Sequence, residues 1–223
     1  MGVKQYNSAR KRFDLWKDVF PNIAYMTYVR ELRSVLHGCS TVLDVGCGGS
    51  SPLRFVDALS LVGVEGWRPN VLKAVEDGTH DTVFEGRAEE IGGLFADNQF
   101  EAVVALDVVE HLVKDKGAQF LKELERVASK LVVVLTPNGF LPQHSADGDL
   151  EEHLSGWTVT EMTELGYEVT GMYGYKNLRG ECQNLKGRPK FVWGVISEFT
   201  HYLYTRKHPQ SAAALFCVKR ISG

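Results

Sequence analysis

The feature that most constrains the fold is the stretch 41–51, TVLDVGCGGSS. Its first half is apolar and rich in β-branched side chains, which predicts a buried strand over 41–45. Its second half is small and glycine-rich, which predicts a tight turn, and Pro52 suits the first position of a following helix because its missing N–H would be unpaired there. A strand, a glycine turn and a helix in this order let the backbone approach a nucleotide-like ligand closely.

A second apolar run, residues 61–65, ends in an acid. Glu65 follows Asp44 by 21 residues, about the spacing at which an acid meets a ribose in a βαβ unit. A dinucleotide fingerprint would need a third glycine where Ser51 stands. This mismatch disfavours a nicotinamide-dependent oxidoreductase, which stays the weakest alternative.

Four motifs then occur in one order along the chain, at 42–49, 63–65, 100–112 and 131–138. Together they resemble the class I S-adenosylmethionine (SAM)-dependent methyltransferases, over residues 41–172. The resemblance implies a methyltransferase of the EC 2.1.1 type, with SAM as cofactor and S-adenosylhomocysteine (SAH) as product. It also implies an α/β, Rossmann-like, doubly wound sheet of seven strands in the order 3-2-1-4-5-7-6, with strand 7 antiparallel.

The apolar patterning supports such an alternation of strands and helices. The chain has 223 residues, 44% of them hydrophobic, which is enough for one α/β domain with attachments. We expect an N-terminal helical segment over 1–38 and a SAM-binding domain over 39–223, with 173–211 as an acceptor-side insertion between strands 6 and 7. Strands are expected near 41–45, 61–65, 81–85, 100–106, 130–136, 167–172 and 212–218, and helices near 52–59, 68–77, 115–129 and from 158.

The net charge and the cysteine spacing limit which partners and metal or disulfide sites are expected. The net charge is −3, so no nucleic-acid partner is expected. The four cysteines lack metal-type spacing, which disfavours a zinc site or a disulfide framework. No signal peptide and no apolar run long enough to cross a membrane are visible, so a cytoplasmic protein without a membrane span is expected. No motif specifies an oligomeric state.

The resemblance assigns cofactor contacts to residues at the strand ends. Gly46 and Gly48 would let the backbone approach the methionine part of SAM. Asp44 would accept from the SAM ammonium, the alternative being a turn cap. Glu65 would hold the ribose hydroxyls, the alternative being a solvated acid. Gly66 and Asp107 complete this set.

The adenine side departs from the family pattern. The N–H of Ala88 would donate to the adenine ring. Arg87 stands where the family usually has an acid, and a guanidinium cannot accept from the adenine amino group. Glu89 is the alternative acceptor.

Glu110 and His111 are the candidate catalytic residues. They follow strand 4, at the sheet edge where open α/β sheets bind ligands. A histidine there could remove a proton, the alternative being a pair that caps and packs. Metal-ligand types crowd the next loop, but a solvated loop is predicted and no metal; these are His144, Asp147, Asp149, Glu151, Glu152 and His153.

A small-molecule acceptor is the predicted substrate. The chain lacks an Asn- or Asp-Pro-Pro-Tyr sequence and any Pro-Cys pair, which disfavours some amino-group and cytosine methyltransferases. A non-catalytic SAM-binding partner protein, or a protein or nucleic-acid methyltransferase, are the alternatives.

Acceptor choice is expected in 173–211, with help from the N-terminal helices, whose alternative role is packing on the sheet edge. An apolar face at helical spacing must bury against the core, a partner subunit or an apolar acceptor, and core packing is favoured. Its members are Val192, Val195, Ile196, Phe199 and Leu203, together with Tyr202.

Overall fold

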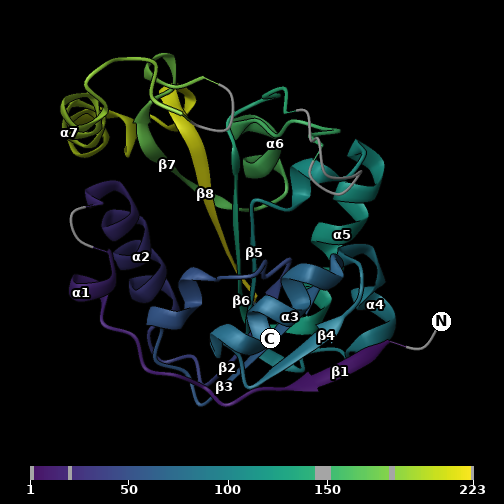
Figure 1. Cartoon of the computed structure of the whole chain (residues 1–223). Coiled ribbons are helices and arrows are strands. Elements are labelled where there is room, and N and C mark those ends of the chain that lie inside the picture. Colours follow the sequence, from purple (N-terminus) through teal and green to yellow (C-terminus); the bar gives the residue numbers. More distant parts are fainter. Residues whose placement is uncertain (1–2, 20–21, 144–151, 181–183, 222–223) are drawn as a thin grey trace.

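The computed structural model describes residues 3–19, 22–143, 152–180 and 184–221. Within these ranges the strands form a single mixed sheet in the order β1-β4-β3-β2-β5-β6-β8-β7 (Figure 1). The strands are β1 (Lys4–Asn7), β2 (Thr41–Val45), β3 (Ser60–Glu65), β4 (Thr82–Glu85), β5 (Phe100–Leu106), β6 (Ala128–Pro137), β7 (Glu168–Tyr175) and β8 (Ala212–Arg220). The predicted α/β fold class is confirmed. From β4 to β7 the order is the predicted one, and β8 pairs antiparallel with both β6 and β7.

The sheet has one strand more than predicted. β1 lies at its edge and pairs antiparallel with β4, where the sequence predicted only helix at the N-terminus. The Tyr6 hydroxyl fixes this pairing, because it donates to Glu85 Oε2 at 2.8 Å. Four residues are too few to show a two-residue period, which is why the pattern did not reveal β1.

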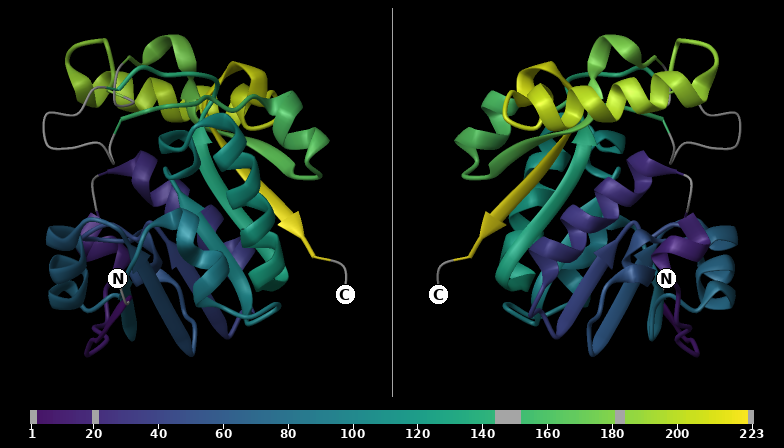
Figure 2. Two further views of the ribbon diagram at one scale, coloured as in Figure 1. Left: turned by 90° about the vertical axis from the view of Figure 1, so that its right-hand side faces the viewer. Right: turned by 90° about the vertical axis from the view of Figure 1, so that its left-hand side faces the viewer.

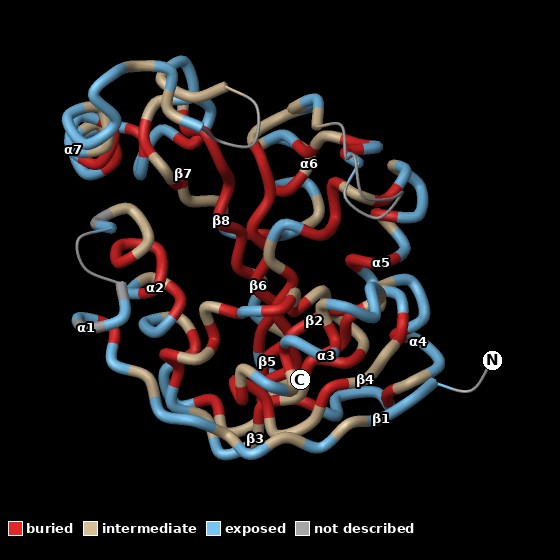
Figure 3. Tube along the Cα trace, viewed as in Figure 1, coloured by how far each residue is buried: buried red, intermediate tan, exposed pale blue. Residues whose placement is uncertain are grey.

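Helices cover both faces of the sheet (Figure 2). They are α1 (Leu15–Val19), α2 (Ile23–Leu36), α3 (Arg68–Asp77), α4 (Ile91–Leu94), α5 (Lys114–Val127), α6 (Val159–Glu164) and α7 (Lys190–Thr200). Alternate strand residues supply two cores: Leu43 packs with the α5 residues Phe120 and Leu124, whereas Val42 packs with Leu32 of α2. Buried backbone therefore runs through the middle of the sheet (Figure 3).

Local signals account for the helix boundaries. Gly78, with a φ of 69°, ends α3 in the left-handed conformation that glycine adopts easily. The predicted capping box opens α6, with Thr158 and Glu161 bonding each other's backbone. The helix predicted over 52–59 is only a 3-10 turn, η1 (Pro52–Phe55), because Val56 is already extended and the chain re-enters the sheet at Ser60.

The connection between β7 and β8 folds over the carboxyl end of the sheet. It contains η4 (Lys176–Leu178), α7, the π-helical turn η6 (His201–Thr205) and η7 (Pro209–Ser211). α7 packs on β7 and on α2, above which it lies in Figure 1. The apolar face predicted here exists, but the prediction that it packs on the core is wrong: Phe199 and Leu203 are 64% and 67% exposed.

Candidate active site

Two cavities meet at the carboxyl end of the sheet. The glycine-turn cavity, of about 660 Å³, is lined by Gly46, Gly48 and Glu65 among others. The histidine cavity, of about 440 Å³, is lined by Glu110 and other residues described below. Asp107 and His111 line both cavities, so they mark the place where ligands bound in the two would meet.

The turn after β2 favours glycine at two positions. Gly46 and Gly48 have φ values of 71° and 60°, in the left-handed region. A Cβ on Gly46 would lie 2.4 Å from Val108 Cγ2. The Gly46 and Cys47 N–H groups both donate to the Val64 carbonyl, at 2.8 and 3.0 Å, which ties the turn to the end of β3.

Glu65 joins this turn to the next one. Its Oε2 accepts from the Gly48 N–H at 2.9 Å, and its Oε1 accepts from the Trp67 N–H at 2.7 Å. Burial raises the pKa of this carboxyl, and the N–H bonds act in the opposite sense. Each carboxylate oxygen can accept two hydrogen bonds, so acceptor capacity is left for a ligand in the cavity it lines.

Other predicted cofactor residues also line the glycine-turn cavity. Gly66 and Ala88 lie on its wall, as do Arg87 and Glu89. Arg87 Nε lies 3.6 Å from Glu89 Oε2, so the guanidinium that replaces the family's acid pairs with the alternative acceptor.

Asp44 lies behind the turn rather than on the cavity wall. It is 1% exposed, and its Oδ2 lies 2.9 Å from His80 Nε2, a residue that the sequence analysis did not single out. A histidine from the loop before β4 thus occupies one oxygen of the carboxylate that was predicted to accept from the SAM ammonium. The contact favours a structural role for Asp44 in fixing the turn.

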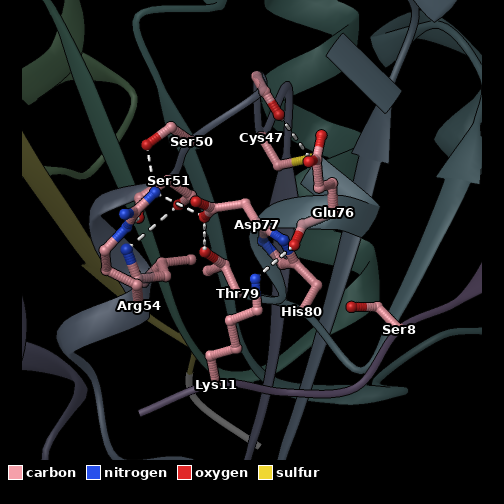
Figure 4. Close-up of polar contacts among 12 residues, drawn as sticks. Ser8, Lys11, Cys47, Ser50, Ser51, Arg54, Glu76, Asp77, Thr79 and His80 are labelled. Atoms are coloured by element: carbon pink, nitrogen blue, oxygen red, sulfur yellow. Dashed lines mark hydrogen bonds and ion pairs between the residues drawn. The ribbon is translucent and has the colours of Figure 1, made fainter. Parts of the chain in front are cut away.

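A polar cluster anchors the far side of the same turn (Figure 4). The Arg54 guanidinium bonds the Ser50 hydroxyl and lies 2.5 Å from Asp77 Oδ2. The same oxygen of Asp77 accepts from the Thr79 hydroxyl at 2.6 Å. These contacts tie η1 to the end of α3, so the glycine turn is held on both flanks.

Asp107 adopts a conformation that few side chains tolerate. Its φ is 55°, in the left-handed region where aspartate is accepted more readily than most residues. Loss of hydration among the surrounding protein atoms raises its pKa to about 6. The residue is nevertheless exposed where the two cavities meet, so solvent there opposes this rise.

Glu110, His111 and His153 form a cluster around the second cavity. The two rings are 4.9 Å apart, and one ligand atom from each of the three residues lies within 4.8 Å of the others. Burial, followed by the nearby Asp107, raises the pKa of Glu110 well above its usual range. Its Oε2 accepts from the Thr136 hydroxyl at 3.1 Å.

The backbone partners of the histidines identify which nitrogen carries the proton. His111 Nδ1 lies 3.0 Å from the Glu152 carbonyl, and His153 Nδ1 lies 2.6 Å from the Leu141 carbonyl. A carbonyl only accepts, so each Nδ1 donates and each Nε2 carries the lone pair when the ring is neutral. Burial lowers the pKa of His153, which favours the neutral ring.

One carboxylate oxygen and two imidazole nitrogens can hold a divalent transition-metal ion. No metal was predicted from the sequence, and the clustering of these three residues leaves that prediction untested. Of the loop residues considered there, His144, Asp147, Asp149 and Glu151 lie outside the described part of the chain.

The remaining walls of the histidine cavity come from the N-terminal segment and the connection after β7. Tyr25 of α2 lines it, together with Tyr173 and Arg179. Tyr173 has a φ of 63°, a strained conformation for a tyrosine, at a break in the β7 register. Arg179 Nε donates to the Tyr173 carbonyl at 2.8 Å. No local motif marks these three residues, because only the tertiary fold brings them together.

Comparison with protein families gives one match, over residues 43–141, to a family described as "Methyltransferase domain". The match covers the part of the chain from β2 to the residues just after β6. The matched residues include the glycine turn, the end of β3 and the segment from Asp107 to His111. The predicted resemblance to class I SAM-dependent methyltransferases is confirmed, and SAM as the cofactor is supported. A search of curated protein sequences found no match.

Several solved structures share the fold of this chain at low sequence identity. A SAM-dependent methyltransferase from Archaeoglobus fulgidus has a TM-score of 0.58 and 16% identity, covering 92% of this chain and 97% of that one. The plantazolicin methyltransferase BamL, solved with SAH, has a TM-score of 0.55 and 13% identity, with coverages of 93% and 88%. The small RNA methyltransferase HEN1 has a TM-score of 0.54 and 17% identity, with coverages of 96% and 27%. Within the described residues, no helix is long and apolar enough to cross a bilayer.

Proposed function

We propose that the chain is a SAM-dependent methyltransferase that binds SAM in the glycine-turn cavity and a small-molecule acceptor in the histidine cavity. The observation that carries the proposal is that Asp107 and His111 line both cavities, so a sulfonium methyl in one can face a nucleophile in the other. Gly46, Gly48 and Glu65 would hold the methionine and ribose parts of SAM.

The two cavities differ in a way that suits this division. The glycine-turn cavity offers close backbone approach and a carboxylate for hydroxyl groups, which a nucleoside requires. The histidine cavity, at about 440 Å³, has room for a small molecule and is walled by Tyr25, Tyr173 and Arg179. Because the last two belong to 173–211, we propose that this insertion selects the acceptor, and that residues 1–38 assist it through α2.

Methyl transfer needs little covalent help from the protein. The acceptor's lone pair attacks the methyl carbon, the carbon–sulfur bond breaks, and neutral SAH leaves. Holding the two reactants in line can lower the barrier by roughly 7–11 kcal/mol. Where the acceptor is a hydroxyl or an amine, His111 Nε2 would take its proton, because Nδ1 donates to the Glu152 carbonyl.

The cluster of Glu110, His111 and His153 supports a second candidate role. One nitrogen of each ring and one carboxylate oxygen lie within 4.8 Å of one another, close enough to share one cation. A divalent cation bound there would supply Lewis-acid chemistry, lowering the pKa of an acceptor hydroxyl. In that case His111 would be a ligand rather than a base.

Transfer of tritium from methyl-labelled SAM tests the proposed function. The purified protein is incubated with a small-metabolite extract, and separately with protein and RNA fractions from the same cells. Label in a small molecule is expected. Label confined to protein or RNA would move the acceptor to one of those classes, and SAM binding without any transfer would indicate a non-catalytic binder. We propose the cytoplasm as the place of this reaction.

A further inference from the structure

The helix α7 and the turn η6 expose their apolar face and bury their polar face. Their outward face is apolar: it comprises Phe191, Val192, Val195, Ile196, Phe199, Tyr202 and Leu203, which are 37% to 70% exposed. Their inward face is polar: Ser197, Glu198, His201 and Thr205 are at most 6% exposed. A surface helix normally shows the reverse arrangement, with its apolar stripe toward the core.

Specific bonds fix this orientation. The Ser197 hydroxyl donates to the Tyr173 carbonyl at 2.8 Å, and Glu198 accepts from the Thr27 hydroxyl at 2.8 Å. Two glycines of β7 seat the backbone closely: a Cβ on Gly174 would lie 2.2 Å from the Ser197 carbonyl oxygen, and one on Gly171 would lie 2.0 Å from that of Thr205. The helix therefore cannot roll over to bury its apolar face without breaking this fit.

Single exposed apolar residues are ordinary, but a continuous row of large ones is typical of a binding surface. The row lies on the outer edge of the molecule, where the α7 tube alternates between exposed and buried (Figure 3). We call the seven outward residues the α7 apolar face.

Basic residues flank the α7 apolar face at both ends. Lys186, Arg188 and Lys190 precede it, and Arg206 and Lys207 follow it; all five are exposed, and Arg206 pairs with Glu31 of α2 at 2.7 Å. The only acidic residue over 184–208 is Glu198, which is buried. This segment is therefore positively charged, although the whole chain has a net charge of −3.

We propose that the α7 apolar face docks on an anionic lipid bilayer, lying in the interfacial plane with the basic residues against the headgroups. An apolar helical face with lysine and arginine at its margins has the charge and shape for such a surface. Eleven residues of α7 are too short to span a bilayer. A second copy of the chain fits less well, because a symmetric interface would set the same basic margins against each other.

Docking in this orientation places the histidine cavity beside the membrane. Arg179 lines that cavity and its Nη2 lies 3.2 Å from the Ser197 hydroxyl on the inward side of α7. Such docking needs only the α7 apolar face and its basic flanks, and it would occur whether or not the chain transfers methyl groups.

Vesicle flotation tests the proposal with the full chain. The wild type should float with vesicles of equal parts phosphatidylcholine and phosphatidylglycerol, and much less with phosphatidylcholine alone. The double variant Phe199→Ser, Leu203→Ser should bind the anionic vesicles about 100-fold more weakly, since full burial of each side chain contributes roughly a factor of ten or more. The matched control Leu59→Ser, Leu72→Ser removes leucines that are 85% and 51% exposed elsewhere, and should bind like the wild type.

A second experiment neutralises the basic residues that precede the α7 apolar face. Lys186→Gln, Arg188→Gln and Lys190→Gln together should weaken binding at low salt and flatten its salt dependence. Failure of the wild type to float, or equal flotation of the Phe199→Ser, Leu203→Ser variant, would overturn the proposal. So would a wild-type dimer that this variant dissociates, which would identify a second copy as the occupant. SAH titration of each variant separates loss of cofactor binding from loss of membrane binding.

Discussion

Replacement of Glu65 by glutamine changes one oxygen at the point where two turns of the proposed cofactor site are joined. In the wild type the carboxylate accepts from the Gly48 N–H at 2.9 Å and from the Trp67 N–H at 2.7 Å. Glutamine can keep only one of these bonds, because its NH₂ group is a donor and would face the other N–H. Either the glycine turn or the start of α3 must then move.

The magnitude follows from the bonds that are lost. A hydrogen bond to a charged group contributes roughly 1.5–3 kcal/mol, which corresponds to about 10- to 150-fold in a binding constant. Glu65→Gln loses one such bond to the backbone, and it would also weaken the proposed bonds to the ribose hydroxyls. We expect SAH affinity to fall at least about 30-fold, and the free energy of unfolding without ligand to fall by about 1–2 kcal/mol.

Isothermal titration with SAH and chemical denaturation without ligand measure the two effects. Glu76→Gln is the matched control, because it removes the same charge from the exposed side of α3 without touching the cavity. Wild-type affinity in Glu65→Gln would refute the assignment of Glu65 to the cofactor site. Lost stability with unchanged affinity would leave it a purely structural residue.

Other perturbations test other parts of the structure. Gly46→Ala should lower SAH affinity at least about tenfold, because its Cβ would lie 2.4 Å from Val108 Cγ2 and φ is 71°; calorimetry measures this. His111→Ala should slow methyl transfer by about 10² while SAH affinity is kept, and a loss of wild-type activity in a chelator, restored by a divalent cation, would identify a ligand role instead. Burial raises the pKa of Glu198 in the folded protein, so folding takes up protons and the free energy of unfolding falls as pH rises above the ordinary glutamate range. Glu198→Gln should lose that slope and be the more stable form at pH values above the raised pKa, as urea denaturation across pH would show.

Much of the fold could be predicted because its signals are local. The strands from β2 to β8 are apolar runs of the expected length, and α3 begins beside Pro69 and ends at Gly78. β1 could not be predicted, because a four-residue edge strand gains its stability from β4 and not from its own pattern. The length of the helix predicted over 52–59 was overestimated, because helical propensity does not reveal how soon the chain must re-enter the sheet.

In the candidate site, too, residues marked by local signals could be predicted and contacts that depend on the tertiary fold could not. Gly46, Glu65 and Asp107 could be proposed because they follow strands whose carboxyl ends must meet at one edge. The pairing of Asp44 with His80 could not, because it depends on where a loop returns in three dimensions.

The orientation of α7 shows a different limit of sequence patterning. Periodicity correctly grouped Val192, Phe199 and Leu203 on one face, yet it gives no direction for that face. Here the inward side is chosen by hydrogen bonds of Ser197 and Glu198 and by the glycines of β7 that accept the helix backbone.

Titration of the purified protein with SAH, and with NAD as the comparison, tests the central claim most directly. The glycine turn, Glu65 and the wall around Ala88 predict one SAH site per chain with a dissociation constant in the micromolar range, about −8 kcal/mol. NAD should show no binding, because Ser51 stands where a dinucleotide fingerprint needs its third glycine. Binding of NAD without binding of SAH or SAM would contradict the account.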